Sequence, residues 1–188
     1  MKALIICDMD YKTEIFHDLQ ETIYDILGKK EFDIELVEIG TKKVTFCKGC
    51  FGCWVKKPGE CTMNDAMADI NRSYINSDVT VYLSPVIFGQ FSANIKNAID
   101  RSLPNMLPFF VTRRDGSTAH PPRYESYPRQ IIIGYGEEIA GDDKQLFMDI
   151  TKKHRGNLEV LIYEGQNDNE NIVAVFNQLE LAKVEGML

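Results

Sequence analysis

Short apolar runs alternate with amphipathic stretches along this chain, and that alternation restricts its fold more than any other feature. Five runs have the length and composition of strands buried on both faces of a sheet. They span residues 2–7, 33–39, 79–83, 130–133 and 158–163. Because helical stretches separate these runs, the connections predict right-handed crossovers and a doubly wound α/β fold, in which a five-stranded parallel sheet has helices on both faces.

The helical stretches carry start and stop signals at their ends. Thr13, Asn64 and Ser92 have side chains suited to the N-cap position, and Gly28 suits the end of the first helix. The apolar residues of that first helix recur on a single stripe, as expected of a helix packed on a sheet. The predicted helices cover residues 14–28, 65–74, 93–103, 143–154 and 171–184.

Length and charge limit the partners that the chain can have. Its 188 residues suffice for one domain, spanning residues 1–188. A net charge of −7 argues against nucleic-acid binding, which needs a basic surface. No apolar run approaches the roughly 20 residues that a membrane-spanning helix needs, and the first residues turn acidic, at Asp8, too soon for a secretory signal. We therefore expect a cytoplasmic protein with reduced thiols and without nucleic-acid or membrane partners.

Four of the five cysteines lie close together in the sequence. Cys47, Cys50, Cys53 and Cys61 form the pattern Cys-x2-Cys-x2-Cys-x7-Cys. Spacings of two residues let successive thiolates face a common centre, and the intervening glycines let the backbone curl around it. The pattern favours a [4Fe–4S] cluster over zinc, because structural zinc sites usually use two separate cysteine pairs. The remaining alternative is that these cysteines only pack a tight turn.

Two connections between the predicted elements are long: the Cys-rich loop at residues 40–64 and a Pro-rich arm at residues 104–129. The arm holds five of the seven prolines, and a connection of this length is usually a lid, a subunit contact or disordered. We interpret it as a packed arm at a subunit contact, whose arginines could also receive the phosphates of a nicotinamide cofactor. Its basic residues are Arg113, Arg114, His120 and Arg123.

Several motifs resemble those of one enzyme family. Residues 50–61, Asn64-Asp65, the run 84–92 and Asp100-Arg101 are similar to segments of the NADPH-dependent FMN reductase family, and the cysteine spacing is similar to that of its iron–sulfur flavoproteins. The resemblance implies a flavodoxin-like fold with FMN at the carboxyl edge of the sheet. It also implies reduction by NAD(P)H or a protein donor, redox small molecules or an electron-carrier protein as partners, and a homodimer or homotetramer.

The same resemblance implies which residues contact the flavin. The segment that begins at Ser84 would lie along the isoalloxazine ring and offer it backbone polar groups and apolar side chains. The turn after the fourth strand would face the ring from the other side, and the start of the first helix would attract the phosphate. No catalytic side chain is expected, because the cofactors supply the redox chemistry. The expected cofactor-binding residues are Lys12, Thr13, Ser84, Pro85, Val86, Ile87, Phe88, Gly89, Gly134, Tyr135 and Gly136.

The first loop, residues 7–13, departs from a phosphate-binding sequence. It contains no glycine, and it places Asp8 and Asp10 where a phosphate dianion would lie. Either both carboxylates point away, or the flavin binds through other contacts, or the flavin site has been lost. Two hypotheses follow. One is an FMN-dependent oxidoreductase in which a cluster on the cysteines relays electrons. The other is a non-enzymatic protein of the same fold that uses its cysteines for metal binding or redox sensing.

Overall fold

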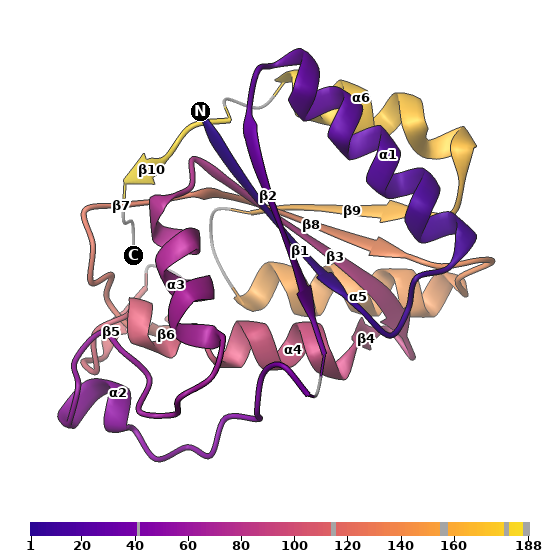
Figure 1. Ribbon diagram of the computed structural model, residues 1–188. Coiled ribbons are helices and arrows are strands. Elements are labelled where there is room, and N and C mark those ends of the chain that lie inside the picture. Colours follow the sequence, from indigo (N-terminus) through magenta and orange to yellow (C-terminus); the bar gives the residue numbers. More distant parts are fainter. Residues whose placement is uncertain (41, 114–115, 155–157, 179–180, 186–188) are drawn as a thin grey trace.

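Five parallel strands form the centre of the molecule. The computed structural model describes residues 1–40, 42–113, 116–154, 158–178 and 181–185. The strand order in the sheet is β2-β1-β3-β8-β9, and a short strand, β4, pairs antiparallel with the end of β3. The predicted doubly wound sheet is therefore confirmed (Figure 1). The strands are β1 (Lys2–Asp8), β2 (Asp33–Ile39), β3 (Val79–Ile87), β4 (Gln90–Phe91), β8 (Arg129–Tyr135) and β9 (Leu158–Tyr163).

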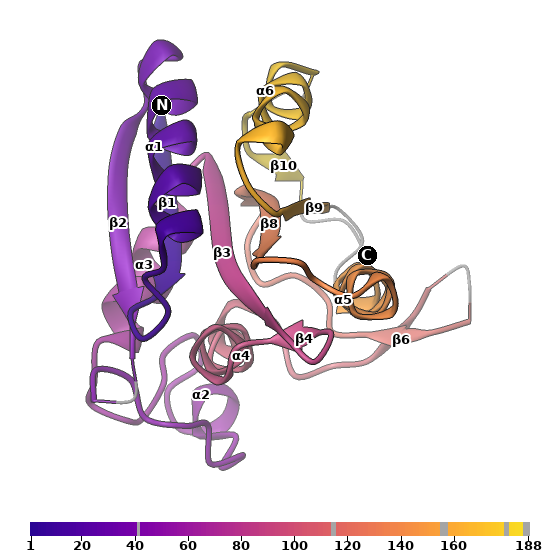
Figure 2. The same cartoon turned by 90° about the vertical axis from the view of Figure 1, so that its right-hand side faces the viewer.

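Helices cover both faces of this sheet. One face carries α1 (Glu14–Lys29) and α6 (Asn169–Gln178). The opposite face carries α3 (Met67–Asn76), α4 (Ala93–Asp100) and α5 (Gly141–His154) (Figures 1 and 2). Helices on both sides explain why β1, β3 and β8 read as nearly continuous apolar runs, since both faces of these inner strands are covered.

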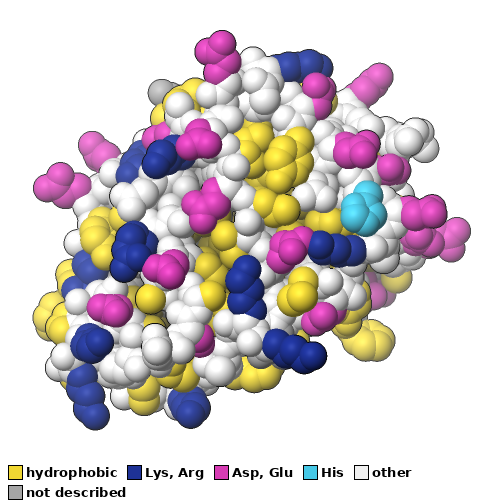
Figure 3. Space-filling view, in the orientation of Figure 1, with side chains coloured by type: hydrophobic (Ala, Val, Ile, Leu, Met, Phe, Trp, Pro, Cys, Tyr) yellow, Lys and Arg dark blue, Asp and Glu magenta, His cyan; other side chains and the backbone are white. Residues whose placement is uncertain are grey.

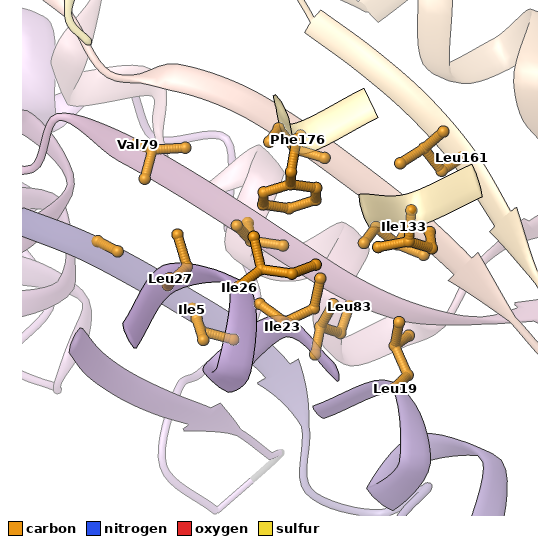
Figure 4. Packing of buried hydrophobic residues seen from close by; sticks show 14 of the residues in the cluster. Ile5, Leu19, Ile23, Ile26, Leu27, Val79, Leu83, Ile133, Leu161 and Phe176 are labelled. Carbon is orange, nitrogen blue, oxygen red and sulfur yellow. The ribbon is translucent and has the colours of Figure 1, made fainter. Parts of the chain in front are cut away.

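The core consists of two clusters, one on each side of the sheet. Alternate residues of β1 point to opposite faces, so Ile5 packs under α1 and α6 while Ile6 packs under α3, α4 and α5. On the first face, α1 contributes the apolar stripe expected from the sequence, which meets the strands and Phe176 of α6 (Figure 4). The buried residues of α1 are Phe16, Leu19, Ile23, Ile26 and Leu27.

The two long connections contain short elements of their own. The Cys-rich loop holds a single helical turn, α2 (Gly52–Val55). The Pro-rich arm, for which the sequence indicated no regular structure, begins with η1 (Leu103–Asn105). It continues through the antiparallel pair β5 (Val111–Thr112) and β6 (Thr118–Ala119). Its end, β7 (Ser126–Tyr127), pairs with β10 (Val184–Glu185), and η2 (Gln166–Asp168) precedes α6.

Several boundaries differ from those expected, including that of the helix expected over 93–103, which ends at Asp100; the contacts explain three of them. β3 continues to Ile87 instead of ending at Leu83, because the chain folds back at once and β4 pairs with its last residues. The helix expected to begin after Asn64 begins at Met67, since the carboxylate of Asp65 accepts the Met67 N–H at 3.1 Å. The helix expected over 171–184 is described only to Gln178, and Val184 pairs with the arm as a strand instead.

No helix in the described part of the chain is both long and apolar enough to cross a membrane.

Candidate flavin site and cysteine cluster

Three connections meet at the carboxyl edge of the sheet, where the strand order reverses. After β1 the chain crosses to α1 on one face, and after the neighbouring β3 it crosses to α4 on the other. The hydroxyl of Tyr135, at the end of β8, donates to the backbone oxygen of Tyr11 at 2.8 Å. The side chain of Asn94, at the start of α4, donates to Asp8 at 2.9 Å. These bonds join the loops after β1, β3 and β8 at the position where doubly wound sheets bind their ligands.

The loop after β1 leads into a capped helix. Thr13 is the N-cap of α1, and its hydroxyl accepts the N–H of Phe16 at 3.3 Å, as expected. Helix geometry leaves the N–H groups of Glu14 and Ile15 without a partner inside the helix, so this end attracts anions. Lys12, the cation expected to assist, forms an ion pair with Glu38. The hydrogen bond to Glu38 raises the pKa of Lys12, so its charge is already balanced by a carboxylate.

Asp8 and Asp10 turn toward the start of α4. Asp8 is fully buried, and its Oδ1 accepts both the Asp10 N–H and the Asn94 amide, each at 2.9 Å. Asp10 Oδ2 accepts from the same Asn94 nitrogen at 2.8 Å. Because Asn94 lies in the first turn of α4, the positive end of that helix dipole also favours the two negative charges. The second oxygen of Asp8, Oδ2, is buried and has no hydrogen-bond partner among the residues that the structure describes.

The phosphate end of FMN does not fit this loop as a free dianion. Two like charges about 4 Å apart cost roughly 4 kcal/mol at an effective dielectric constant near 20. A helix N-terminus returns about 0.3–1 kcal/mol, and up to about 2 kcal/mol when it is partly buried. With Asp8 and Asp10 beside the loop and Lys12 held by Glu38, repulsion exceeds attraction for a phosphate placed at the start of α1.

The connection after β3 forms a tight hairpin at the same edge. Ser84 is fully buried; its hydroxyl donates to Pro85 O at 3.0 Å and accepts the Ser92 N–H at 3.2 Å, so it serves the turn itself. Ser92 is the N-cap of α4, as expected. Phe88 and Gly89 have positive φ values of 49° and 68°, and Phe88 is 87% exposed. The half-buried side chains of Val86 and Ile87 precede this exposed ring, so the hairpin presents an apolar surface.

The expected glycine-rich turn after β8 is mostly strand. Gly134 pairs with Ser84 inside the sheet, and a Cβ atom there would lie 2.7 Å from Phe147 Cε1 and 2.8 Å from Val86 Cγ2. Close packing under α5 therefore explains this glycine. Tyr135 is buried, and burial raises the pKa of its hydroxyl well above the usual range. Gly136 donates its N–H to Tyr163 O at 3.2 Å and lies half-exposed at the edge.

The four loop cysteines are free thiols near one end of the molecule. Cys47 and Cys50 are exposed, and Cys53 and Cys61 are half-buried. Burial, together with the nearby thiols of Cys61, Cys47 and Cys50, raises the pKa of Cys53. Hydrogen bonds from the Gly52 backbone and the Thr62 hydroxyl lower the pKa of Cys50. Within the described residues no three Cys, His, Asp or Glu side chains converge on one metal position. Four cysteine thiols suit a metal bound by thiolates. The loop holds these thiols near one another but does not bring them together around one metal position.

A buried arginine closes this loop, and sequence reasoning had not assigned it a role. Arg101 is 2% exposed and binds both carboxylate oxygens of Asp65, at 2.9 and 2.8 Å. It also donates to Thr45 O at 2.5 Å and to Cys61 Sγ at 3.4 Å. Burial opposes ionisation of Asp65, but hydrogen bonds from Arg101 and Thr45 outweigh it and hold the pKa of this carboxyl well below its usual range. The only hint in the sequence was the family-like pair Asp100-Arg101.

A row of aromatic rings joins the Cys-rich loop to the Pro-rich arm. Phe51 stacks on Trp54 at 5.3 Å, and His120 lies 4.7 Å from Trp54 and 4.7 Å from Phe110, all between ring centroids. The indole N–H of Trp54 donates to the backbone oxygens of Leu103 and Met106. His120 thus packs against the loop. Figure 3 shows apolar and basic side chains together over α2 and this loop, at the lower left.

The arginines proposed to receive nicotinamide phosphates have different surroundings. Arg123 donates to the backbone oxygens of Pro104 at 2.8 Å and Met106 at 3.3 Å, so it holds the arm together. Arg113 is half-exposed beside the β5–β6 turn. Arg114 lies outside the described residues.

Comparisons with known proteins agree with this fold and these loops. Residues 1–110 match the NADPH-dependent FMN reductase family. An iron–sulfur flavoprotein of Archaeoglobus fulgidus is 40% identical over 78 residues, 42% of this chain and 34% of that protein. One of Methanocaldococcus jannaschii is 29% identical over 90 residues, 48% and 46% of the two chains. The matches thus span less than half the length of these relatives.

Solved structures are similar over nearly the whole chain. The NAD(P)H:quinone oxidoreductase from Methanothermobacter marburgensis has a TM-score of 0.63 and 10% identity, covering 93% of this chain and 92% of that one. The flavoenzyme FerB, an NAD(P)H:(acceptor) oxidoreductase from Paracoccus denitrificans, has a TM-score of 0.59 and 10% identity, covering 98% and 100%. At this identity the likeness establishes the flavodoxin-like fold alone. With more than half of its residues matched, this chain belongs to the NADPH-dependent FMN reductase family.

Proposed function

We propose that this chain is an FMN-dependent oxidoreductase, reduced by NAD(P)H, that passes electrons to a redox small molecule or an electron-carrier protein. The observation that carries the proposal is the meeting of three loops where the strand order reverses. Bonds from Tyr135 to Tyr11 and from Asn94 to Asp8 join these loops. Family membership supports the same reading, since the match covers β1, β3 and the loops that follow them.

In this proposal the chain positions the flavin, and no side chain acts as an acid or base. A bound flavin would supply acceptance of a hydride and its release as single electrons. The β3–β4 hairpin from Ser84 to Gly89 would lie against the ring with the apolar side chains Val86, Ile87 and Phe88 and shield it from water. The half-exposed Gly136 would border the ring from the β8 side, and Lys12 and Thr13 would lie at its ribityl end.

Bound flavin and its reduction test this function directly. The protein would be purified without oxygen, its absorption spectrum recorded, and riboflavin or FMN added to the apo-protein while flavin fluorescence is followed. The proposal predicts saturable quenching at one flavin per chain, and bleaching of the bound flavin by NADH or NADPH. Absence of quenching by either flavin would refute it.

We propose further that Cys47, Cys50, Cys53 and Cys61 hold a [4Fe–4S] cluster beside the flavin. Four thiols on one loop support this assignment, as does Arg101 beside Cys61, since a buried cation offsets the negative charge of thiolates. Cys50→Ser should remove iron and sulfide after anaerobic reconstitution and leave flavin content unchanged. Cys7→Ala, in the core of β1, is the control that keeps the iron. Stoichiometric zinc in place of iron, or flavin lost together with iron in Cys50→Ser, would contradict separable flavin and cluster sites.

A second function is favoured by the acidic loop after β1. A protein that has lost its flavin could keep the fold and use the cysteines for metal binding or redox sensing. Asp8 and Asp10, both turned to Asn94, are the observation behind it. A colourless protein that holds zinc and quenches neither flavin would establish this alternative.

A further inference from the structure

The charges around the start of α1 are mostly negative. Within residues 8–14 the carboxylates are Asp8, Asp10 and Glu14, and the one cation is Lys12. Lys12 forms its ion pair with Glu38, which adds a fourth carboxylate to the same edge. An anionic ligand at this helix N-terminus is therefore attracted by the free N–H groups and repelled by the carboxylates around them.

Asp8 is a buried charge that its surroundings compensate only in part. Its side chain is fully buried, and its Oδ2 has no hydrogen-bond partner in the described part of the molecule. Its Oδ1 accepts from two neutral donors, the Asp10 N–H and the amide nitrogen of Asn94, and that same nitrogen also serves Asp10. A neutral amide shared between two carboxylates cannot cancel either charge. The field of this pair reaches the loop, and salt can screen the part that comes from Asp10, because this carboxylate is exposed.

We infer that the 5′-phosphate of a flavin contributes no affinity here, and that the site binds riboflavin at least as tightly as FMN. This inference rests on the proposed flavin site and specifies its ligand. The ring is recognised by the β3–β4 hairpin, whereas Asp8 and Asp10 determine the preference against phosphate. Both carboxylates are specificity-determining residues, because they act on the part of the ligand that differs between the two flavins.

The response to salt separates this arrangement from an ordinary phosphate site. If Lys12 and the helix N-terminus received the phosphate, added salt would screen an attraction and weaken FMN binding. If Asp8 and Asp10 repel the phosphate, added salt screens a repulsion and tightens FMN binding, while the uncharged riboflavin responds much less. The direction of the change therefore reports the sign of the charge that FMN meets.

The experiment measures dissociation constants of riboflavin and FMN by fluorescence quenching, from about 0.01 M to about 0.5 M salt, where the Debye length falls severalfold. The variants are Asp8→Asn and Asp10→Asn. Asp10 is exposed, so its variant tests the inference even if the buried Asp8→Asn fails to fold. The control is Asp25→Asn, which removes the same charge from the exposed surface of α1, roughly 16 Å along the helix from Glu14.

We expect wild-type protein to bind riboflavin as tightly as FMN or more tightly. Added salt should narrow any difference between the two dissociation constants. Asp10→Asn should tighten FMN binding by about threefold or more and leave riboflavin within about twofold, while Asp25→Asn changes neither. Tighter binding of FMN than of riboflavin by about threefold, weakened by salt, would overturn the inference and leave the proposed function standing. Unchanged FMN affinity in Asp10→Asn would also overturn it. Binding of neither flavin would overturn both.

Discussion

Arg101 shows how a single side chain can organise a loop that has little structure of its own. It reaches from the end of α4 to both ends of the Cys-rich loop, since Thr45 precedes the first loop cysteine and Asp65 follows the last. A buried ion pair stabilises little by itself, because desolvation offsets the attraction between the charges. Its geometry is specific, however, and it fixes where the loop begins and ends.

Removing this cation should be costly. Arg101→Met leaves Asp65 buried without its partner, and we expect a loss of about 3–5 kcal/mol in the free energy of unfolding, measured by urea denaturation. The matched control is Arg72→Met, whose partner Asp69 lies on the exposed side of α3; this change should stay within about 1 kcal/mol. Equal losses in the two variants would contradict a structural role for Arg101.

The same pair predicts a dependence of stability on pH. Because the folded-state pKa of Asp65 is depressed, its contribution is fully present above the unfolded value near 4 and is lost as pH falls toward the folded value. Between pH 5 and pH 3, wild-type protein should lose about 1 kcal/mol more than Asp65→Asn. Urea denaturation at both pH values measures this difference; parallel losses in the two proteins would show that Asp65 titrates normally.

For single residues, the sequence indicated which charged side chains matter but not their hydrogen-bond partners. It singled out Asp8 and Asp10 as charges in conflict with a phosphate, and the structure shows them bonded to Asn94, more than 80 positions away in the sequence. No local pattern contains such a pairing, because it depends on α4 beginning beside the end of β1. For the same reason the role of Arg101 could not be predicted from its neighbours in sequence.

Among the elements, the Cys-rich loop and the Pro-rich arm form one unit. Trp54 lies between them: its ring stacks on Phe51 and meets His120 at a tilt, and its indole N–H is hydrogen-bonded to two backbone oxygens of the arm. The loop contributes only one helical turn, so its position depends on this contact and on Arg101. These contacts show that Trp54 holds the arm against the loop.

Trp54→Ala should therefore loosen both connections at once. We expect limited proteolysis to cleave the loop at residues 40–64 and the arm at residues 104–129 several-fold faster, since local opening controls cleavage. The exposed Phe46→Ala serves as the control, because no ring contact of this row involves it. Faster cleavage of the loop alone would contradict a joint unit.

The sequence predicted the strands wherever burial on both faces of the sheet gives a continuous apolar stretch. All five strands of the parallel sheet were placed in this way. Residues 84–87 were interpreted as a loop, because Ser84 and Pro85 suggest a strand end, yet pairing with β4 extends β3. Similarly, Val184 looks helical in its local sequence, and it becomes a strand because Tyr127 of the arm pairs with it. Pairing partners distant in sequence decided both cases.

At the scale of the whole molecule, the surface around α2 and the arm suggests a contact between subunits. Phe109 and Phe110 are 65% and 73% exposed, and Phe46, Phe51 and Val55 of the loop are also exposed. Apolar side chains gathered in this way usually mark interaction sites. We propose a homodimer or homotetramer of the single domain, assembled through this surface.

A charge placed in that surface should separate the subunits. Light scattering after gel filtration should give an oligomeric mass for wild-type protein and a monomeric mass for Phe110→Asp at about micromolar concentration. Phe88→Asp, which places the same charge on the exposed tip of the β3–β4 hairpin, should leave the mass unchanged. A monomeric wild-type protein would contradict the proposed assembly.

We propose that the carboxyl edge of the sheet holds a flat flavin ring between the β3–β4 hairpin and the end of β8. Titration with lumiflavin, the ring without its ribityl chain or phosphate, tests it most directly, because no other part of the ligand can contribute. A ring held at this edge should give saturable fluorescence quenching at one ring per chain, and Phe88→Ala should weaken the binding severalfold. Unquenched lumiflavin at millimolar protein, or quenching that Phe88→Ala leaves unchanged, would contradict it.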